Sequence, residues 1–237
     1  MNLVILTTDT LHHRYFVQAV QAALPIARVF VESEARARPG FETAHDFETA
    51  RDRHESDCWF KGSAPALGTL APSEWFPNLN SPDAVRAIGA AKPDALVVFG
   101  TGRLNEAIIA LCPDGAVNLH GGNPEDYRGL DTHLWAIYHG DFPALMTTLH
   151  RLAPRLDAGD IIEKLALPLR RGMALHELRQ VNTEICVRLT LDALAGFVRV
   201  GRFVGQAQRR LGRYYSFMPA VLKDLCVERF ARHTSAL

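Results

Sequence analysis

The fold class is decided by residues 95–120, which read ALVVFGTGRLNEAIIALCPDGAVNLH. The apolar runs Ala95–Phe99 and Ala116–His120 predict two buried strands, and Asn105–Leu111 between them has the apolar spacing of a helix. Strands that alternate with helices favour right-handed βαβ units. We therefore expect an α/β protein whose mostly parallel, twisted sheet is flanked by helices.

The same alternation continues toward the N-terminus. Leu3–Leu6 and Ile26–Val31 are apolar runs typical of buried strands, and His12–Ala23 between them has a helical period. Further along the chain, the tripeptide SPD at residues 81–83 predicts the start of a helix, because proline is favoured just inside the N-cap.

Three regions give less regular predictions. Residues 41–60 are charged and polar, and they predict a surface helix or a long loop. Residues 67–80 predict irregular structure, because prolines and turn residues interrupt them. Thr132–His139 predicts a helix whose N-cap is Asp131 or Thr132.

The C-terminal half predicts two strands and a long helix. Ala144–Leu152 and Ile161–Leu169 have strand-like apolar patterns, and Ala174–Val200 follows them as a helix. We expect residues 1–200 to form the main domain and residues 201–237 to form a short C-terminal appendage. Arginines outnumber acidic residues in this appendage, which indicates a basic face exposed to solvent or to a second copy.

The overall composition is that of a globular protein. Of the 237 residues, 48% are hydrophobic and 22% are charged, which is enough apolar material for a core and excludes disorder as the main state. The chain has 26 lysines and arginines and 26 aspartates and glutamates, so its formal net charge is zero. Nucleic-acid binders usually carry a basic excess, so the sequence predicts no nucleic-acid partner.

The cysteines, the N-terminus and the hydropathy restrict the cellular setting. The cysteines lie far apart and lack the short spacing of a metal site, so we expect core thiols in a reducing cytoplasm and no bound metal. Residues 1–6 lack the basic segment of a signal peptide. No stretch approaches the ~20 apolar residues of a membrane helix, so no membrane partner is expected. The cysteines are Cys58, Cys112, Cys186 and Cys226.

Polar side chains lie at the carboxyl end of the second strand quoted above. Successive residues of a strand point to opposite faces, so Asn118 and His120 share one face. An amide donor beside an imidazole can stabilise an oxyanion and move a proton. Asp157 is either an ordinary Asx-turn residue or a carboxylate aimed at His120 to fix its tautomer. The tripeptide YRG at residues 127–129 is either a surface turn or a third part of the same site.

Taken together, these pieces have the order and spacing of a known family. Asn118-x-His120, YRG at 127–129 and LDAG at 156–159 resemble the folate-dependent formyltransferases, and the resemblance spans residues 95–169. That family includes glycinamide ribonucleotide formyltransferase, methionyl-tRNA formyltransferase and the formyltransferases of nucleotide-linked amino sugars. The resemblance implies a Rossmann-like fold and an invariant catalytic trio, whose matching residues here are Asn118, His120 and Asp157.

The resemblance also implies a co-substrate, the formyl donor N10-formyltetrahydrofolate. A neutral primary amine would attack its formyl carbon while Asn118 donates a hydrogen bond to the developing oxyanion. Asp157 would position His120 and help to remove the amine proton. The expected donor-binding residues, which act largely through backbone groups, are Gly100, Thr101, Gly102, Arg103, Leu104, Asn105, Arg155 and Leu156.

Departures from the family pattern narrow the choice of amine acceptor. Residues 7–10, TTDT, contain no glycine and include Asp9, which argues against a glycinamide ribonucleotide phosphate. The short C-terminal segment and the zero net charge argue against tRNA. LGRYY at residues 211–215 resembles a tyrosine-containing stretch of the amino-sugar enzymes. We therefore predict a small-molecule acceptor, a nucleotide-linked amino sugar, and consider a homodimer formed through the apolar side of the last segment.

Two other functions stay open at this point. The same trio can direct water onto formyltetrahydrofolate, which would make the chain a hydrolase, although such hydrolases usually carry an extra N-terminal regulatory domain. A folate- or nucleotide-binding module without turnover is the other, although all three trio residues are present. A dinucleotide oxidoreductase is disfavoured, because no glycine fingerprint follows the first strand.

Overall fold

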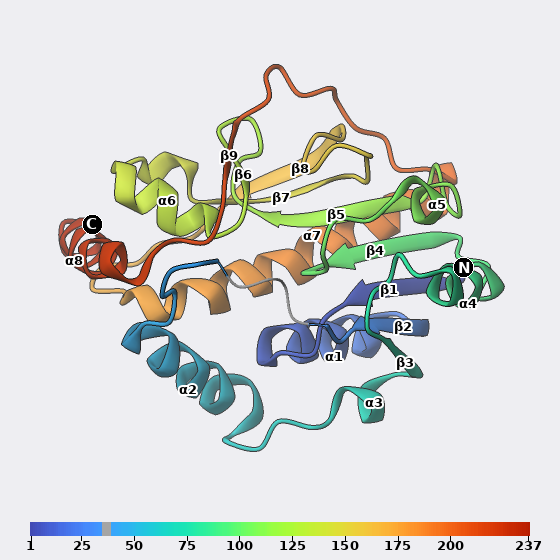
Figure 1. The fold of residues 1–237 in the computed structure, drawn as a ribbon, viewed down its shortest axis with the longest axis horizontal. Coiled ribbons are helices and arrows are strands. Elements are labelled where there is room, and N and C mark those ends of the chain that lie inside the picture. Colours follow the sequence, from blue (N-terminus) through green and yellow to red (C-terminus); the bar gives the residue numbers. More distant parts are fainter. Residues whose placement is uncertain (35–38) are drawn as a thin grey trace.

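The strands of the described residues form one large sheet and one small sheet. The computed structural model describes residues 1–34 and 39–237. The strands in these residues are β1 (Leu3–Thr7), β2 (Ile26–Glu32), β3 (Ser73–Phe76), β4 (Ala95–Phe99), β5 (Ala116–Gly121), β6 (Tyr127–Gly129), β7 (Met146–Arg151), β8 (Ile161–Ala166) and β9 (Arg213–Tyr215). Seven of these described strands form a sheet of order β3-β2-β1-β4-β5-β7-β8, and β6 pairs with β9 (Figure 1).

The large sheet is mostly parallel, as predicted. β3, β2, β1, β4 and β5 run parallel to one another, whereas β7 is antiparallel to β5 and β8 is antiparallel to β7. The helices are α1 (Leu11–Ala23), α2 (Asp46–Phe60), α3 (Leu67–Leu70), α4 (Pro82–Ala90), α5 (Glu106–Ile109), α6 (Thr132–His139), α7 (Leu178–Val200) and α8 (Ala220–Ser235), with 3-10 turns η1 (Phe142–Ala144) and η2 (Leu175–Glu177). None of the helices in the described ranges combines the length and apolarity needed to cross a bilayer.

The central strand β1 explains why the sheet has helices on both faces. Leu3 and Ile5 pack into a core with α1 and α7, whereas Val4 and Leu6 pack into a second core that includes α4 and α5. All four side chains are fully buried. A strand that is buried on both faces has an uninterrupted apolar sequence, which is the pattern that residues 3–6 show.

The C-terminal residues pack beside the sheet and α6. Figure 1 shows α6 and α8 together at one end of the sheet, and β9 running alongside β6. Ile137 of α6 and Phe230 of α8 belong to a third buried cluster, which Met218 also joins. The strand β9 is a second attachment of the C-terminal residues to the rest of the protein, because it pairs with β6 in parallel register, with Tyr127 opposite Arg213.

Three local predictions can now be compared with the observed elements. Residues 41–60 include the surface helix α2, which is one of the two predicted forms. The prediction of irregular structure for residues 67–80 was wrong, because α3 forms there and β3 pairs with the edge of β2 through Trp75 and Val31. Asp131 occupies the N-cap position of α6 without capping it, since its carboxylate accepts a hydrogen bond from the amide of Met218.

A buried ion pair ties α2 to α7. The Glu55 carboxylate is fully buried and accepts two hydrogen bonds from the Arg179 guanidinium, both at 2.6 Å. Arg179 also contacts Asp52 on the exposed side of α2. A buried carboxylate is costly unless it is paired, so the position of α2 depends on Arg179.

We predict that removing one partner of this pair costs more than removing both. Arg179→Met should lower the unfolding free energy by ~3 kcal/mol, because it leaves the Glu55 charge buried without its partner. The double variant Glu55→Met/Arg179→Met should recover most of that loss, since it buries no charge. Urea denaturation of the single and double variants measures the difference, and a double variant less stable than Arg179→Met would contradict the argument.

Candidate active site

The strands β5 and β7 place a group of polar side chains on one face of the sheet. The apolar residues of β5 that alternate with Asn118 and His120 pack against α1 and α7, so these two side chains point to the opposite face. The antiparallel register sets Asn118 opposite His150 and His120 opposite Thr148. Cross-strand partners share a face, so all four side chains lie together.

The loop between β7 and β8 returns over this face. Because β7 is antiparallel to β5, its carboxyl end lies at the edge opposite the carboxyl ends of the parallel strands. The loop nevertheless brings Asp157 Oδ1 within 3.6 Å of His120 Nδ1 and within 3.6 Å of His150 Nε2. Asp157 Oδ2 accepts a hydrogen bond of 2.9 Å from the Gly129 amide. The predicted trio of Asn118, His120 and Asp157 therefore lies in one cluster.

The tautomer of His120 is set by a backbone carbonyl. His120 Nε2 lies 2.8 Å from Tyr127 O, and a carbonyl only accepts, so Nε2 carries the hydrogen. Nδ1 is then the nitrogen that faces Asp157. The imidazole is only 5% exposed, so a proton taken up at Nδ1 lies in a nearly dry site beside a carboxylate. This arrangement gives His120 the means to accept and release a proton at Nδ1.

His150 is a site residue that the sequence reasoning missed. Its Nδ1 donates to the Arg151 carbonyl at 2.8 Å, and its Nε2 accepts from Asn118 Nδ2 at 3.1 Å in the neutral imidazole. His150 is 2% exposed and orients the Asn118 amide, which leaves the second N–H of that amide for another acceptor. Pairing the predicted strand Ala144–Leu152 with β5 would have found it, because the pairing aligns the two side chains.

The surroundings of Asp157 keep its carboxyl ionised. Burial raises its pKa, but the charges of His120 and His150 in their protonated forms, the hydrogen bond that protonated His150 can donate and the Gly129 amide together outweigh burial. The net result is a pKa well below the ordinary range of an aspartate. Asp157 is therefore a fixed negative charge at neutral pH rather than a proton donor.

The two segments predicted to bind the donor lie next to each other. Arg103 Nε donates to the Pro154 carbonyl at 3.0 Å, which joins the Gly100–Asn105 loop to the loop that carries Arg155 and Leu156. The Glu32 carboxylate accepts from the Gly102 amide at 2.6 Å and holds the first loop against β2. An open hollow of about 520 Å³ lies beside this junction and is lined by Arg103, Leu104, Asn105, Glu106 and Ala107.

The side chains of this first loop serve mainly to fix its backbone. Gly100 has a φ of +87°, and a Cβ there would lie 2.1 Å from His13 Nε2, so only glycine fits. Leu104 is buried in the core, and the Asn105 side chain accepts from the Ile108 amide as the N-cap of α5. Backbone groups of the loop are engaged as well, since the Gly102 amide donates to Glu32 and the Asn105 amide donates to Asn80. The role of this loop in donor binding stays a prediction.

The cysteines and acidic residues form no evident metal centre. Cys112, Cys186 and Cys226 are buried and separate, and Cys58 is exposed. Burial raises the pKa of the Cys112 thiol to about 11. Within residues 1–34 and 39–237, no group of three or more histidines, cysteines and acids is placed to hold an ion.

The fold and the cluster define a class: a Rossmann-like α/β protein with an Asn–His–Asp site over its sheet. A family model described as formyl transferase matches residues 19–189, which is most of the chain. The protein belongs to the formyl transferase family. The matched residues include the trio, His150 and both loops that meet at Arg103.

Individual relatives agree with this membership. Methionyl-tRNA formyltransferase from Akkermansia muciniphila is 33% identical over 124 residues, covering 48% of this chain and 39% of that relative. The enzyme of the same name from Trichlorobacter lovleyi is 29% identical over 144 residues, covering 60% of this chain and 45% of its own. The chain thus matches less than half the length of these relatives.

Two solved structures share the fold at low identity. Glycinamide ribonucleotide transformylase 1 from Symbiobacterium toebii has a TM-score of 0.60 at 18% identity, covering 90% of this chain and 95% of its own. The formyltransferase PseJ from Anoxybacillus kamchatkensis, solved with UDP-4,6-dideoxy-4-formamido-L-AltNAc and tetrahydrofolate, has a TM-score of 0.52 at 16% identity and covers 91% of this chain and 86% of its own. These likenesses show the shared fold.

A neutral histidine supports the site from α6. His133 Nε2 donates to the Met146 carbonyl at 2.7 Å, and its ring lies against Gly121 at the end of β5. Burial lowers the pKa of His133 to about 4; its backbone hydrogen bond opposes this shift, and the nearby His120 adds to it. His133 is therefore uncharged at neutral pH, so it adds no positive charge beside Gly121 at the end of β5.

We predict that His133 makes the protein acid-sensitive between pH 6.5 and 4. In that range the unfolded chain binds a proton at His133 and the folded protein does not, so the unfolding free energy falls as the pH falls. His133→Gln keeps an N–H donor for Met146 but cannot titrate. Between pH 6.5 and 4, the unfolding free energy of His133→Gln should fall by ~2 kcal/mol less than that of the wild type. Urea denaturation at each pH measures both. Parallel curves for the two proteins would contradict the assignment.

Proposed function

We propose that the chain is an N-formyltransferase that moves a formyl group from N10-formyltetrahydrofolate to the primary amine of a small molecule. The observation that carries the proposal is the cluster of Asn118, His120 and Asp157, in which the buried Asp157 carboxylate lies 3.6 Å from the buried His120 Nδ1. Membership of the formyl transferase family supports the reaction class. The chain matches less than half the length of its curated relatives. The proposed activity is therefore argued from the chemistry of this cluster and not from the activity of those relatives.

The region around Arg103 is suited to a donor of this size and chemistry. A hollow of about 520 Å³ lies within the range of small-molecule sites. Its lining belongs to the Gly100–Asn105 loop and the start of α5, and Arg103 of that lining joins this loop to the one that carries Arg155 and Leu156. The PseJ structure was solved with tetrahydrofolate, which supports a folate donor here.

Asn118 is the proposed oxyanion donor. The formyl donor supplies a carbonyl carbon whose bond to N10 is exchanged for a bond to the amine. Negative charge develops on the formyl oxygen as the amine attacks, and a fixed N–H aimed at that oxygen stabilises it. One N–H of Asn118 is already bonded to His150, which holds the amide plane and directs the other N–H.

His120 and Asp157 are the proposed proton-handling pair. The attacking amine must be uncharged and must lose a proton when the new C–N bond has formed. His120 Nε2–H is committed to the Tyr127 carbonyl, so Nδ1 receives this proton and passes it on to the departing nitrogen. The ionised Asp157 stabilises the imidazolium during the transfer.

The proposed acceptor is a nucleotide-linked amino sugar. The zero net charge argues against a tRNA substrate, whose phosphates favour a basic protein. The glycine-free stretch at residues 7–10 argues against a ribonucleotide phosphate at the end of β1. PseJ, which shares the fold, was solved with a UDP-linked formamido sugar, and this supports an acceptor of that kind. We further propose a cytoplasmic setting and a homodimer.

The first experiment follows the release of tetrahydrofolate from N10-formyltetrahydrofolate. The protein is assayed without an amine and then with nucleotide-linked amino sugars, glycinamide ribonucleotide, methionyl-tRNA and free amino acids. We expect release only with an amine, and fastest with an amino sugar, because the trio acts on a bound uncharged amine. Mass spectrometry of the acceptor identifies the formamide product.

Each alternative has its own result in the same assay. Release without any amine would establish a formyltetrahydrofolate hydrolase instead. Donor binding without consumption across the whole panel would indicate a folate-binding module. Preference for methionyl-tRNA would retain the formyl transfer but overturn the amino-sugar acceptor.

We predict that Asn118→Ala lowers kcat by ~10² to 10³-fold, because it removes one oxyanion donor. The KM for the donor should change much less, since the amide acts on charge that develops in the transition state. The matched control is Asn2→Ala, which makes the same change at the amino end of β1, where the side chain contacts Lys92. Full activity in Asn118→Ala would rule out the proposed role.

A further inference from the structure

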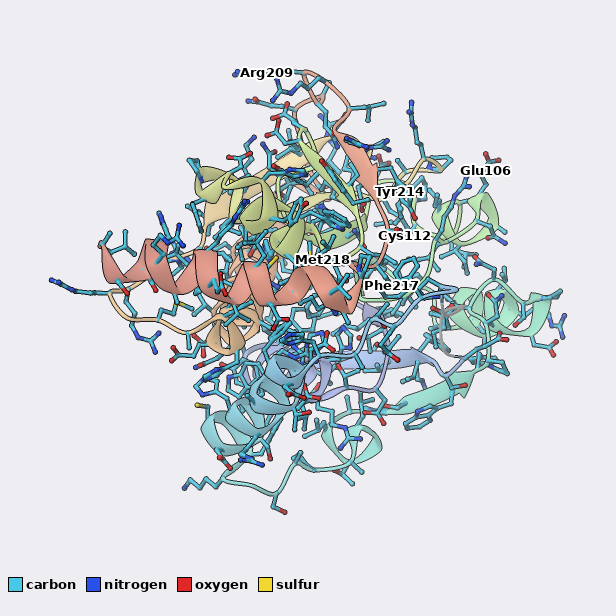
Figure 2. The ribbon with its side chains drawn as sticks, turned by 60° about the vertical axis from the view of Figure 1, so that its left-hand side comes forward. Glu106, Cys112, Arg209, Tyr214, Phe217 and Met218 are labelled. Carbon is cyan, nitrogen blue, oxygen red and sulfur yellow. The ribbon has the colours of Figure 1, made fainter. Side chains whose placement is uncertain are left out.

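The C-terminal strap, residues 205–215, contacts both the loop that carries Asp157 and the loop that follows His120. Figure 2 shows this segment from Arg209 at its tip to Tyr214, and onward to Phe217 and Met218 where the chain approaches α8. At its start, Gln206 pairs with Ile161 through two backbone hydrogen bonds of 2.8 Å. At its end, β9 pairs with β6, and the Leu130 amide donates to Tyr215 O at 2.9 Å. The strap is thus anchored on both sides of the Asp157 loop.

Within the strap, one side chain holds the backbone of the catalytic loop. Gln208 Nε2 donates to the Asp157 carbonyl at 2.8 Å and to the Gly159 carbonyl at 2.9 Å. Both N–H groups of the amide are used, whereas its Oε1 is buried and has no partner among the described residues. A buried acceptor without a partner is unfavourable. The two hydrogen bonds that Nε2 donates are therefore what favours this position of the side chain.

The conformation of Asp157 explains why the loop needs an external hold. Its φ is +51°, in the left-handed region that residues other than glycine seldom occupy. The loop is also pressed against β7, because a Cβ at Gly159 would lie 1.8 Å from Arg151 O. Relaxation of Asp157 to a right-handed conformation would swing its carboxylate away from His120, His150 and the Gly129 amide.

We propose that Gln208 is a positioning residue that holds the Asp157 backbone in its left-handed conformation and so aims the carboxylate at His120. Arg128 acts in parallel, because it donates to the Leu156 carbonyl at 3.0 Å and to the strap at Gly212 O at 2.8 Å. The strap therefore couples the fold of the C-terminal segment to the geometry of the trio. The kinetic consequence of this coupling rests on the proposed formyl transfer, but the structural consequence does not.

The test uses Gln208→Met, which has nearly the same length but cannot donate. The matched control is Gln206→Met, the same change on an exposed residue of the same strap. Amide hydrogen exchange, resolved by residue with NMR, reports two bonds separately in the full-length protein. The Gly129 amide reports the bond to the Asp157 carboxylate, and the Leu130 amide reports the pairing of β6 with β9.

We expect Gln208→Met to speed exchange at Gly129 at least about tenfold and to leave Leu130 unchanged. It should lower kcat for formyl transfer roughly 10- to 100-fold while the KM for the amine changes little, because the loop that carries Asp157 is displaced. Gln206→Met should match the wild type in both measurements.

Two results would overturn the positioning role. The first is unchanged exchange at Gly129 in Gln208→Met. The second is equal acceleration at Gly129 and Leu130, which would make Gln208 a general anchor of the strap rather than a positioning residue for Asp157. If the wild type transfers no formyl group but the Gly129 effect is present, the proposed function fails and the structural inference stands.

Discussion

A carboxylate buried between two imidazoles is the constraint on which the site depends. The Asp157 side chain is 5% exposed, and burying an ionised group is costly unless opposite charges and donors surround it. Its partners come from four places: His120 on β5, His150 on β7, the Gly129 amide on β6 and, through the backbone, Gln208 on the strap. The stable position of Asp157 therefore requires all of these elements to be folded together.

The antiparallel direction of β7 has two consequences for the site: it aligns His150 with Asn118, and it sends the following loop away from His120. By pairing antiparallel with β5, it sets His150 opposite Asn118, so an imidazole holds the amide at 3.1 Å. The same direction makes the following loop leave the sheet at the edge away from His120. The loop must then fold back across the sheet face, where it needs support from outside the large sheet in addition to its contacts with β5 and β7. Contacts from β6 and the C-terminal strap supply that support.

Much of the fold was predictable because its signals are local. A run such as Leu3–Leu6 can only be buried on both faces, and the alternation in β5 fixes the common face of Asn118 and His120. What the sequence did not reveal depends on distant partners. The strand β3 exists because it pairs with β2, His150 faces Asn118 only through strand pairing, and Gln208 meets Asp157 from 51 residues away. The order and spacing of motifs identified the trio but not what holds it.

The strap links a segment outside the family match to the geometry of the trio. The family match ends at residue 189, so the trio and the donor-side loops lie within the shared core and residues 205–215 lie beyond it. Arg209 and Gly212 of the strap bond to residues 124–125 in the loop that follows His120, while Gln208 holds the loop of Asp157. A change in this segment can therefore reshape the loop beside His120 without altering the strand that carries Asn118. It cannot do so freely, because the same segment contacts the backbone of Asp157 and Gly159, so any change in the strap must preserve the geometry of the trio.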